Sequence, residues 1–212
     1  MELNKIYNVD CLEFMKSMPD KCVDLVITDP PYGINIAKSG TVGGSNASNV
    51  KNYGKSNWDI TTPSKEVFDE MIRISKKQII FGGNYFTDKL PQSNKWIIWD
   101  KKADGATFSD GELIWTSERG AVKFIRFMWR GMLQEHMDNK EQRFHPTQKP
   151  VEVIGQIVNM FSKEGDIIFD PFLGSGTTAL AARNLGRNFI GCEISKEYCE
   201  IAEGRLKQGI LV

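Results

Sequence analysis

The segment that most constrains the fold is a strand, a glycine turn and a helix near the carboxyl end of the chain. The apolar run Ile167–Phe169 leads into Asp170 and then into a turn that contains Gly174 and Gly176. The sequence TTALAARNLG follows, and its alanines and leucines favour a helix. Glycines in such a turn allow positive φ and let a ligand approach the backbone closely. The segment therefore predicts an α/β fold that binds a nucleoside-type ligand at the turn.

An acidic residue lies at the spacing expected for a ribose contact. The apolar run Phe189–Cys192 ends at Glu193, which is 19 positions after Gly174. An acid about 20 residues downstream of the glycines commonly binds a ribose hydroxyl. The sequence from Gly174 to Ala179 also satisfies the dinucleotide fingerprint G-x-G-x-x-G/A. Taken alone, this segment leaves open a nicotinamide or flavin enzyme, and also a turn without a ligand.

The sequence ITDPPYG, near the amino end, carries the second strong signal. The run Val23–Thr28 is apolar and rich in β-branched residues, so it predicts a buried strand with Asp29 at its carboxyl end. Pro30 and Pro31 fix two φ angles and remove two N–H donors, which leaves rigid carbonyl acceptors. Asp29 and the Pro30 carbonyl would accept both hydrogens of an exocyclic amino group, and Tyr32 offers a flat face for an extruded base. The alternative is a strand that ends at prolines beside a surface aromatic.

Together these strings resemble the DNA amino-methyltransferases that use S-adenosyl-L-methionine. In that family the D-P-P-Y motif is catalytic, and an F-x-G-x-G motif, here Phe172–Gly176, binds the cofactor. The segment Arg143–Pro150 (RFHPTQKP) is similar to the H-P-T-x-K-P segment that precedes the cofactor motif. The catalytic motif comes first, an order that resembles the β group of these enzymes, and the match spans Val9 to Glu193. The resemblance implies a single catalytic domain over residues 1–212, with a doubly wound, mostly parallel sheet of the Rossmann-like methyltransferase type.

The resemblance also implies roles for individual residues. The catalytic residues would be Asp29, Pro30, Pro31 and Tyr32. The cofactor contacts would be Asp10, Cys11, Asp29, Thr147, Gln148, Lys149, Asp170, Pro171, Phe172, Gly174, Ser175, Gly176, Thr177, Thr178, Glu193 and Ile194. Asp10 equally suits the N-cap of a helix over Leu12–Ser17, and the two roles are compatible. His145 is expected to be a turn residue, and Asn84 falls near the same sheet edge with no assigned role.

Composition fits one compact enzyme. The chain has 212 residues, of which 41% are hydrophobic, so it can bury a full hydrophobic core without covalent cross-links. No apolar run approaches about 18 residues, and the charged amino terminus does not resemble a signal peptide, so a cytoplasmic protein is expected. The family resemblance implies a bacterial or phage source. The four cysteines form no C-x-x-C pair and the two histidines form no ligand cluster, so reduced thiols and no metal are expected.

The charge distribution locates the expected contacts with double-stranded DNA. The net charge is zero, but residues 36–149 hold eighteen basic and thirteen acidic side chains. Arg119–Arg130 (RGAVKFIRFMWR) mixes cations with aromatics, as phosphate contact and base stacking require. The alternative is a strand with core aromatics and solvated cations, and a strand can do both. The candidate DNA contacts are Lys38, Lys51, Lys55, Arg119, Lys123, Arg126 and Arg130.

Two segments are expected to serve DNA recognition. A mobile loop is predicted at about 35–57, since the stretch is rich in Gly, Ser and Asn and contains no acid through residue 56. A small target-recognition insertion is predicted at about 101–142, and a homodimer is compatible with the resemblance. The predicted strands are Asn4–Asn8, Val23–Thr28, Gln78–Phe81, Lys95–Trp99, Gly111–Thr116, Lys123–Met128, Asp166–Phe169 and Phe189–Cys192, with errors expected between Lys95 and Met128.

The expected activity is site-specific methylation of the N6 amino group of adenine in DNA. Asp at position 29 favours adenine over the N4 amino group of cytosine, but Asp versions of the motif also occur among cytosine enzymes. A methyltransferase that acts on RNA or on a protein amide remains an alternative, as does a nucleotide-binding protein without methylating activity. The chain carries no nuclease motif, so it would be the modification enzyme of a restriction-modification system or a solitary or phage-borne enzyme.

Overall fold

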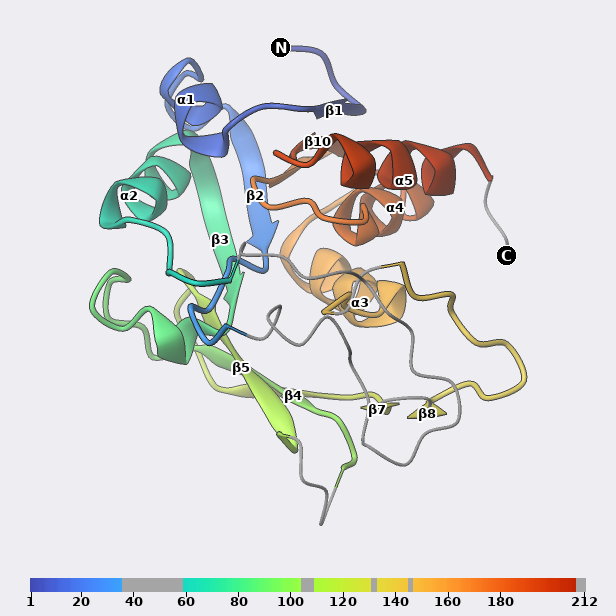
Figure 1. Cartoon of the computed structure of the whole chain (residues 1–212). Helices are drawn as coiled ribbons and strands as arrows, with labels where there is room; N and C mark the ends of the chain where they lie inside the picture. The colour runs from blue at the N-terminus through green and yellow to red at the C-terminus, as the bar shows by residue number, and fades with distance from the viewer. Residues whose placement is uncertain (36–58, 104–108, 131–132, 145–146, 209–212) are drawn as a thin grey trace.

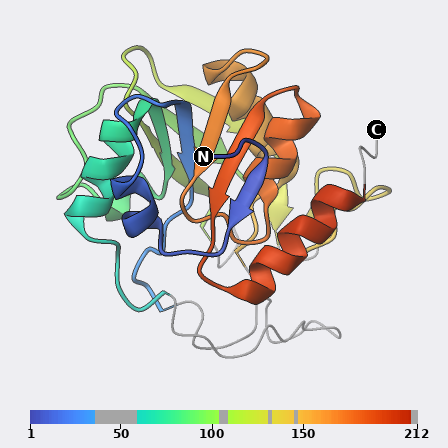
Figure 2. The same ribbon diagram turned by 90° about the horizontal axis from the view of Figure 1, so that it is seen from above.

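A mostly parallel sheet lies between two layers of helices (Figures 1 and 2). The computed structural model describes residues 1–35, 59–103, 109–130, 133–144 and 147–208. Among the described strands, the sheet has the order β1 (Lys5–Tyr7), β10 (Asn188–Cys192), β9 (Ile167–Asp170), β2 (Val23–Thr28), β3 (Ser75–Phe81), β5 (Gly111–Thr116), β4 (Trp96–Asp100) and β6 (Lys123–Arg126). In this described sheet, β5 alone runs antiparallel to its neighbours.

The helices divide between the two faces of the sheet, as Figure 1 shows. One face packs against α1 (Cys11–Lys16) and α2 (Lys65–Ile74), and the other packs against α3 (Val151–Phe161), α4 (Thr177–Asn184) and α5 (Lys196–Lys207). Three short elements, the 3-10 helix η2 (Gly83–Tyr85) and the paired strands β7 (Trp129–Arg130) and β8 (Leu133–Gln134), complete the described structure. The doubly wound fold expected from the sequence is confirmed.

Successive side chains of the buried strands pack alternately against the two layers of helices. In β2, Leu25 and Ile27 pack in the core that includes α3 and α4, whereas Val26 packs in the core that includes α1 and α2. Ile79 and Ile80 of β3 divide in the same way. Successive side chains of a strand point to opposite faces, and a strand covered on both faces is apolar throughout. The continuous apolar runs of the sequence therefore follow from burial on two sides.

The strand order of the sheet reverses between β2 and β9. From β2 the chain crosses through α2 to β3 on one side, and from β9 it crosses through α4 to β10 on the other. These two crossovers use opposite faces of the sheet, and the carboxyl ends of β2 and β9 lie side by side where the crossovers diverge. In open α/β sheets, ligands bind at such a switch point.

The predicted strands all occur in the sheet, with shifted ends. β3 begins at Ser75, three residues earlier than predicted, and Lys76 there forms an ion pair with Asp24 of β2. The predicted strand Lys123–Met128 ends at Arg126. The helices α2 and α5 were not predicted, although Val67, Phe68, Met71 and Ile74 give α2 a clear apolar stripe.

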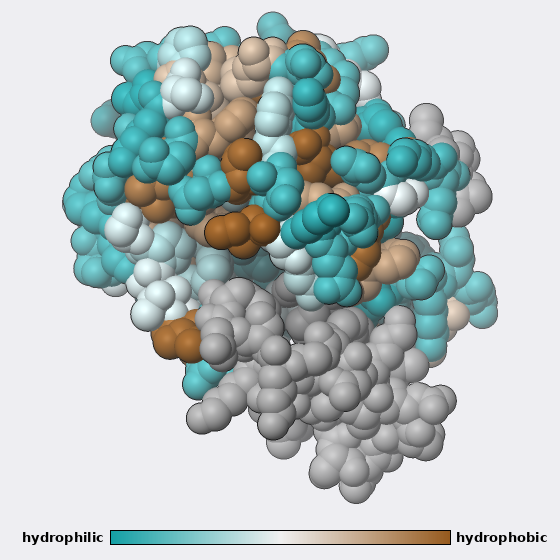
Figure 3. Space-filling view, turned by 45° about the horizontal axis from the view of Figure 1, so that its top comes forward, coloured by the Kyte–Doolittle hydropathy of each residue, from teal (hydrophilic) through white to brown (hydrophobic). Residues whose placement is uncertain are grey.

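Several expectations concern residues outside the described part of the chain. These are the loop at about 35–57, apart from its first residue, together with Lys38, Lys51, Lys55 and His145. The segment at about 101–142 contributes β5 and β6 to the main sheet, and its part in target recognition stays a prediction. Within the described residues, no helix has the length and apolar composition needed to cross a membrane. The described surface in Figure 3 is largely hydrophilic, with small separate hydrophobic areas.

The glycine turn before α4 uses its two glycines differently. Gly176 is the N-cap of α4 at φ +83°, and a Cβ there would lie 2.7 Å from Cβ of Ala202 in α5. Gly174 has φ +54°, but apart from its own chain neighbours no described residue has an atom within 4 Å of its ideal Cβ position. Gly176 is therefore needed for close packing as well as for conformation, whereas Gly174 faces open space.

This difference predicts unequal costs of substitution. Gly174→Ala should lower the free energy of unfolding by about 1 to 2 kcal/mol, since it carries only the left-handed backbone penalty. Gly176→Ala should cost about 1 to 3 kcal/mol more, because its methyl group also overlaps Ala202. Urea denaturation of both variants without ligand measures the difference. Equal costs for the two variants would contradict the packing role of Gly176.

Candidate active site

Residues distant in sequence meet where β2 and β9 end. The hydroxyl of Thr28, the last residue of β2, donates to Oδ1 of Asp170, the last residue of β9, over 2.8 Å. The same oxygen accepts the backbone N–H of Phe172 at 3.0 Å. Asp170 is 4% exposed, and burial raises its pKa to about 6, although its hydrogen bonds oppose the shift. Asp170 therefore links the carboxyl ends of β2 and β9 at the switch point.

Asp29 follows directly after Thr28 and has both carboxylate oxygens engaged. Its Oδ1 accepts the hydroxyl of Tyr32 at 2.5 Å, and its Oδ2 accepts the ammonium group of Lys149 at 2.5 Å. Lys149 comes from the segment before α3, and its side chain is 8% exposed, against 24% for Asp29. The sequence brought Asp29 and Tyr32 together by adjacency, but the contact with Lys149 joins positions 120 residues apart.

A second carboxylate faces the same lysine. Glu112, at the start of β5, lies 3.4 Å from Nζ of Lys149 through Oε2 and 2.7 Å from Nζ of Lys101 through Oε1. Although burial opposes it, the two cations lower the pKa of Glu112, with Lys149 the stronger. Because β5 runs antiparallel, its first residues lie at the edge where β2 ends. Glu112 and Lys101 were not predicted as site residues, and only the sheet pairing reveals them.

Tyr32 is enclosed on several sides. Its ring stacks on Tyr85 with centroids 4.7 Å apart and an interplanar angle of 13°, and it meets the ring of Phe86 edge-on. Gly82, the residue between β3 and η2, packs directly against it, since a Cβ there would lie 2.3 Å from Cε1 of Tyr32. Burial, with the anions Asp29 and Glu112, raises the pKa of Tyr32, so the phenol stays protonated and donates. The flat face expected for a base is covered by Tyr85, which is itself 42% exposed.

Glu193 is bound to the backbone of the glycine turn. Its Oε2 accepts the N–H of Gly174 at 2.9 Å, and its Oε1 accepts the N–H of Ser195 at 2.7 Å. Burial raises the pKa of this half-buried carboxyl, while these hydrogen bonds oppose the shift. Glu193 thus holds the turn next to β10, and a ribose contact stays a prediction. Gly174 has open space beside it, which fits a ligand that approaches the turn.

A buried arginine ties the turn to the segment before α3. Arg205 of α5 is 6% exposed, and its Nη1 donates to the backbone oxygen of Ser175 at 2.7 Å and to Oγ1 of Thr177 at 3.2 Å. Its Nη2 donates to Oε1 of Glu141 at 3.1 Å, and the same oxygen accepts Nε2 of Gln148 at 2.7 Å. The hydroxyl of Ser175 donates to Oε1 of Gln148 at 3.2 Å. Arg205 and Glu141 were missed because neither belongs to a motif.

The other predicted cofactor residues lie along the same edge of the sheet. Asp10 is exposed at the end of β1, where its Oδ1 caps α1 by accepting the N–H groups of Leu12 and Glu13, so its capping role is confirmed. Burial raises the pKa of the Cys11 thiol to about 12, with Asp10 adding to the shift. Thr147, Pro171, Phe172 and Thr178 lie beside the residues described above, and Ile194 is 75% exposed after β10. Their contacts with a cofactor stay predictions.

The basic and aromatic stretch divides between core and surface. Phe127 and Trp129 are buried, whereas Phe124 is 54% exposed and lies under the guanidinium of Arg126 at 5.1 Å. Arg119 and Lys123 are exposed, and Arg130 is half-buried. The core interpretation is confirmed for Phe127 and Trp129, whereas DNA contact by the exposed residues stays a prediction. The exposed cations and Phe124 remain candidates for DNA contact.

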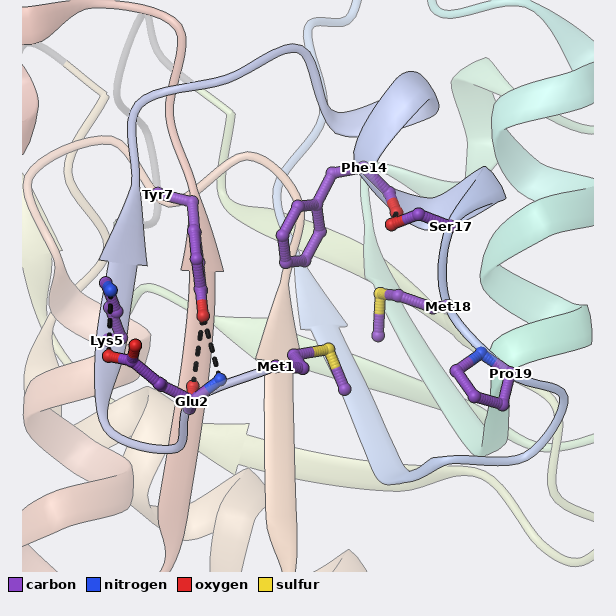
Figure 4. Close-up of a pocket in the computed structure, with 8 residues that line it drawn as sticks. All are labelled: Met1, Glu2, Lys5, Tyr7, Phe14, Ser17, Met18 and Pro19. Atoms are coloured by element: carbon purple, nitrogen blue, oxygen red, sulfur yellow. Dashed lines mark hydrogen bonds and ion pairs between the residues drawn. The ribbon is translucent and has the colours of Figure 1, made fainter.

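A pocket of about 350 Å³ lies away from this edge, between the start of β1 and the end of α1 (Figure 4). Its lining residues are Met1, Glu2, Lys5, Tyr7, Phe14, Ser17, Met18 and Pro19. Ser17–Pro19 precede β2, so the pocket opens at the edge opposite Asp29. Among the described residues, no group of three or more His, Cys, Asp or Glu side chains could hold a metal ion.

Comparison with known proteins gives consistent matches. A family model described as DNA methylase matches residues 63–204. The type II methyltransferase M2.DpnII of Streptococcus pneumoniae is 27% identical in an alignment of 239 positions, which covers 93% of this chain and 87% of that protein.

Solved structures with the same fold cover nearly the whole chain. The DNA modification methylase TTHA0409 from Thermus thermophilus, complexed with S-adenosyl-L-methionine, aligns with a TM-score of 0.60 and 22% identity over 96% of this chain and 94% of that one. The cytosine-N4-specific PvuII DNA methyltransferase aligns with a TM-score of 0.63 and 14% identity over 95% and 85%. At these identities the likenesses establish the fold.

The raised pKa of Asp170 predicts that this residue lowers the free energy of unfolding in a pH-dependent way. Since its folded value of about 6 exceeds the unfolded value of 3.8, the folded state binds the extra proton, and Asp170 destabilises it as pH rises from about 4 to 7. Asp170→Asn, which keeps an acceptor for Thr28, should gain about 2 to 3 kcal/mol relative to the unsubstituted protein over this range. Urea denaturation at several pH values measures the gain. A stability difference that does not change with pH would contradict it.

Proposed function

The chain belongs to the DNA methylase family, and on this basis we propose that it transfers a methyl group from S-adenosyl-L-methionine to the N6 amino group of adenine in DNA. The arrangement that best supports this function is Asp29, held at the switch point by Tyr32 and Lys149 and followed by two prolines. Such a site offers hydrogen-bond acceptors to a ligand that has N–H donors. The relatives are named type II methyltransferases, so we propose the modification role of a type II system.

The cofactor would occupy the half of the edge formed by β1, β10 and β9. Asp10, Glu193 and the turn at Gly174 line that half, and the open space beside Gly174 would admit the cofactor. The homologous fold from Thermus thermophilus carries S-adenosyl-L-methionine, which supports this choice over a dinucleotide. When bound, the cofactor supplies an electrophilic methyl group on a sulfonium sulfur.

Asp29 and Pro30 would act on the amino group of the base. The lone pair of an exocyclic amino nitrogen is delocalised into the ring, so the nitrogen is a weak nucleophile. The Asp29 carboxylate would accept one amino hydrogen and the Pro30 carbonyl the other, which returns electron density to nitrogen as its bond to the methyl carbon forms. The carbon–sulfur bond breaks at the same time, and the proton that nitrogen loses passes to Asp29 or to water.

Tyr32 and Tyr85 would receive the base. The target must leave the duplex to reach Asp29, and an extruded base commonly stacks on an aromatic ring. Since Tyr85 covers Tyr32, the base would stack on the exposed ring of Tyr85 or take its place against Tyr32. The exposed Arg119, Lys123 and Arg126 would contact the phosphates, and Lys38, Lys51 and Lys55 are further candidates outside the described residues. A homodimer is proposed from the family resemblance alone.

The choice of base has a direct test. Purified protein is incubated with isotopically labelled S-adenosyl-L-methionine and unmethylated duplex DNA, and the modified nucleoside is identified by mass spectrometry. N6-methyladenine is the expected product. N4-methylcytosine would keep the mechanism and correct the base, whereas label found only in RNA or protein would reject DNA as the substrate.

Removal of the catalytic carboxylate should abolish turnover. Asp29→Ala should lower kcat by at least about 100-fold, because the amino group loses an acceptor that acts in the transition state. Cofactor affinity, measured by calorimetry, should change little. Asp69→Ala is the control, since Asp69 is 53% exposed and pairs with Lys65 on α2. Unchanged turnover in Asp29→Ala would remove Asp29 from the mechanism.

A further inference from the structure

Lys149 lies between two carboxylates at the candidate active site. Its ammonium nitrogen is 2.5 Å from Oδ2 of Asp29 and 3.4 Å from Oε2 of Glu112, and the rings of Tyr32 and Phe81 lie 5.6 and 5.4 Å away. An 8% exposed lysine is costly unless anions compensate for lost hydration. Although burial opposes it, Asp29 and Glu112 raise the pKa of Lys149 above its usual value. Lys149 is therefore a fixed cation directed at Asp29.

The charged groups around Asp29 shift its pKa in opposite directions. Burial raises its pKa most, Lys149 opposes that rise, and Glu112 adds to it. Tyr32 donates a hydrogen bond that favours the ionised form. Asp170 of β9 is a further acid close enough to interact with Asp29, and Lys101 forms an ion pair with Glu112 at 2.7 Å. An ionised Asp29 thus depends on Lys149, and Glu112 limits how strongly that cation acts.

We propose that Lys149 and Glu112 are positioning residues for Asp29, which they orient and whose charge they balance during methyl transfer. This assigns Lys149 to the base-acceptor side of the site in place of the cofactor contact expected from sequence. The inference rests on the proposed function, because Asp29 needs its negative charge to accept the hydrogen of an amino group. The geometry of one buried cation between two acids, one directly after β2 and one in β5, is independent of the cofactor.

The two positions should have opposite effects on pH dependence. Lys149→Met removes the cation that favours ionised Asp29, so the acid limb of the kcat profile should move to higher pH by about one unit or more. Glu112→Gln removes the anion that disfavours it, so the acid limb should move to lower pH. A merely structural role would lower kcat without moving the limbs in opposite directions.

The experiment measures kcat from pH 5 to 9 on duplex DNA at saturating S-adenosyl-L-methionine, for the unsubstituted protein, Lys149→Met and Glu112→Gln. Lys76→Met is the matched control, since Lys76 is 60% exposed and pairs with Asp24 on the opposite edge of the sheet. Its profile should match that of the unsubstituted protein. If Lys149→Met does not fold, Lys149→Arg should retain the original acid limb with a reduced kcat. The direction in which the acid limb moves in Glu112→Gln is then the deciding result.

A second readout does not depend on turnover. Carbon-13 NMR of carboxyl-labelled aspartate in the full chain, assigned with Asp29→Asn, follows the Asp29 titration without DNA. The pKa of Asp29 should rise in Lys149→Met and fall in Glu112→Gln. If no DNA is methylated by the unsubstituted protein, the proposed function fails while this titration still decides the inference.

Two results would overturn the proposal. One is an Asp29 titration that both substitutions leave unchanged or move in the same direction. The other is at least about tenfold weaker S-adenosyl-L-methionine binding in Lys149→Met without a shifted acid limb, which would return Lys149 to the cofactor. Opposite shifts with unchanged cofactor affinity support it.

Discussion

The parallel pairing of β2 with β9 is the constraint on which the site depends. It places the carboxyl ends of two strands side by side although Thr28 and Asp170 are 142 residues apart, and the hydrogen bond between them fixes that meeting point. The crossovers from these two strands leave on opposite faces of the sheet, which makes their carboxyl ends the switch point of the fold. Asp29 directly follows the last residue of β2, so the register of this strand pair determines the position of the carboxylate that we propose as catalytic.

The charged groups at this edge are tolerated because they compensate one another. A single buried ammonium or carboxylate would be expensive, whereas Lys149 with Asp29 and Glu112 leaves each charge facing an opposite one. Arg205 with Glu141 is a second such pair beside the glycine turn. Buried pairs of this kind seldom add much stability. Their value here is geometric, because they hold side chains from separate elements at hydrogen-bond distance.

Much of the fold followed from local sequence, and the rest required contacts between distant residues. The strands were predictable because burial on both faces makes them apolar runs, and the glycine turn because positive φ favours glycine at Gly174 and Gly176. Asp29 and its prolines stood out for the same local reason. The charged residues Glu112 and Arg205 belong to no sequence motif. The antiparallel direction of β5, which brings Glu112 to the site, cannot be predicted from the local sequence.

Two consecutive residues before α3 connect the two halves of the edge. The side chain of Gln148 accepts the hydroxyl of Ser175 in the glycine turn, at 3.2 Å, while that of Lys149 donates to Asp29 at 2.5 Å. Methyl transfer requires donor and acceptor to be aligned to within a fraction of an ångström, and each would be held by a different half of the sheet. Adjacent residues of one chain segment therefore contact both halves of the edge. Under the proposed function, this segment would align the bound cofactor with the target base.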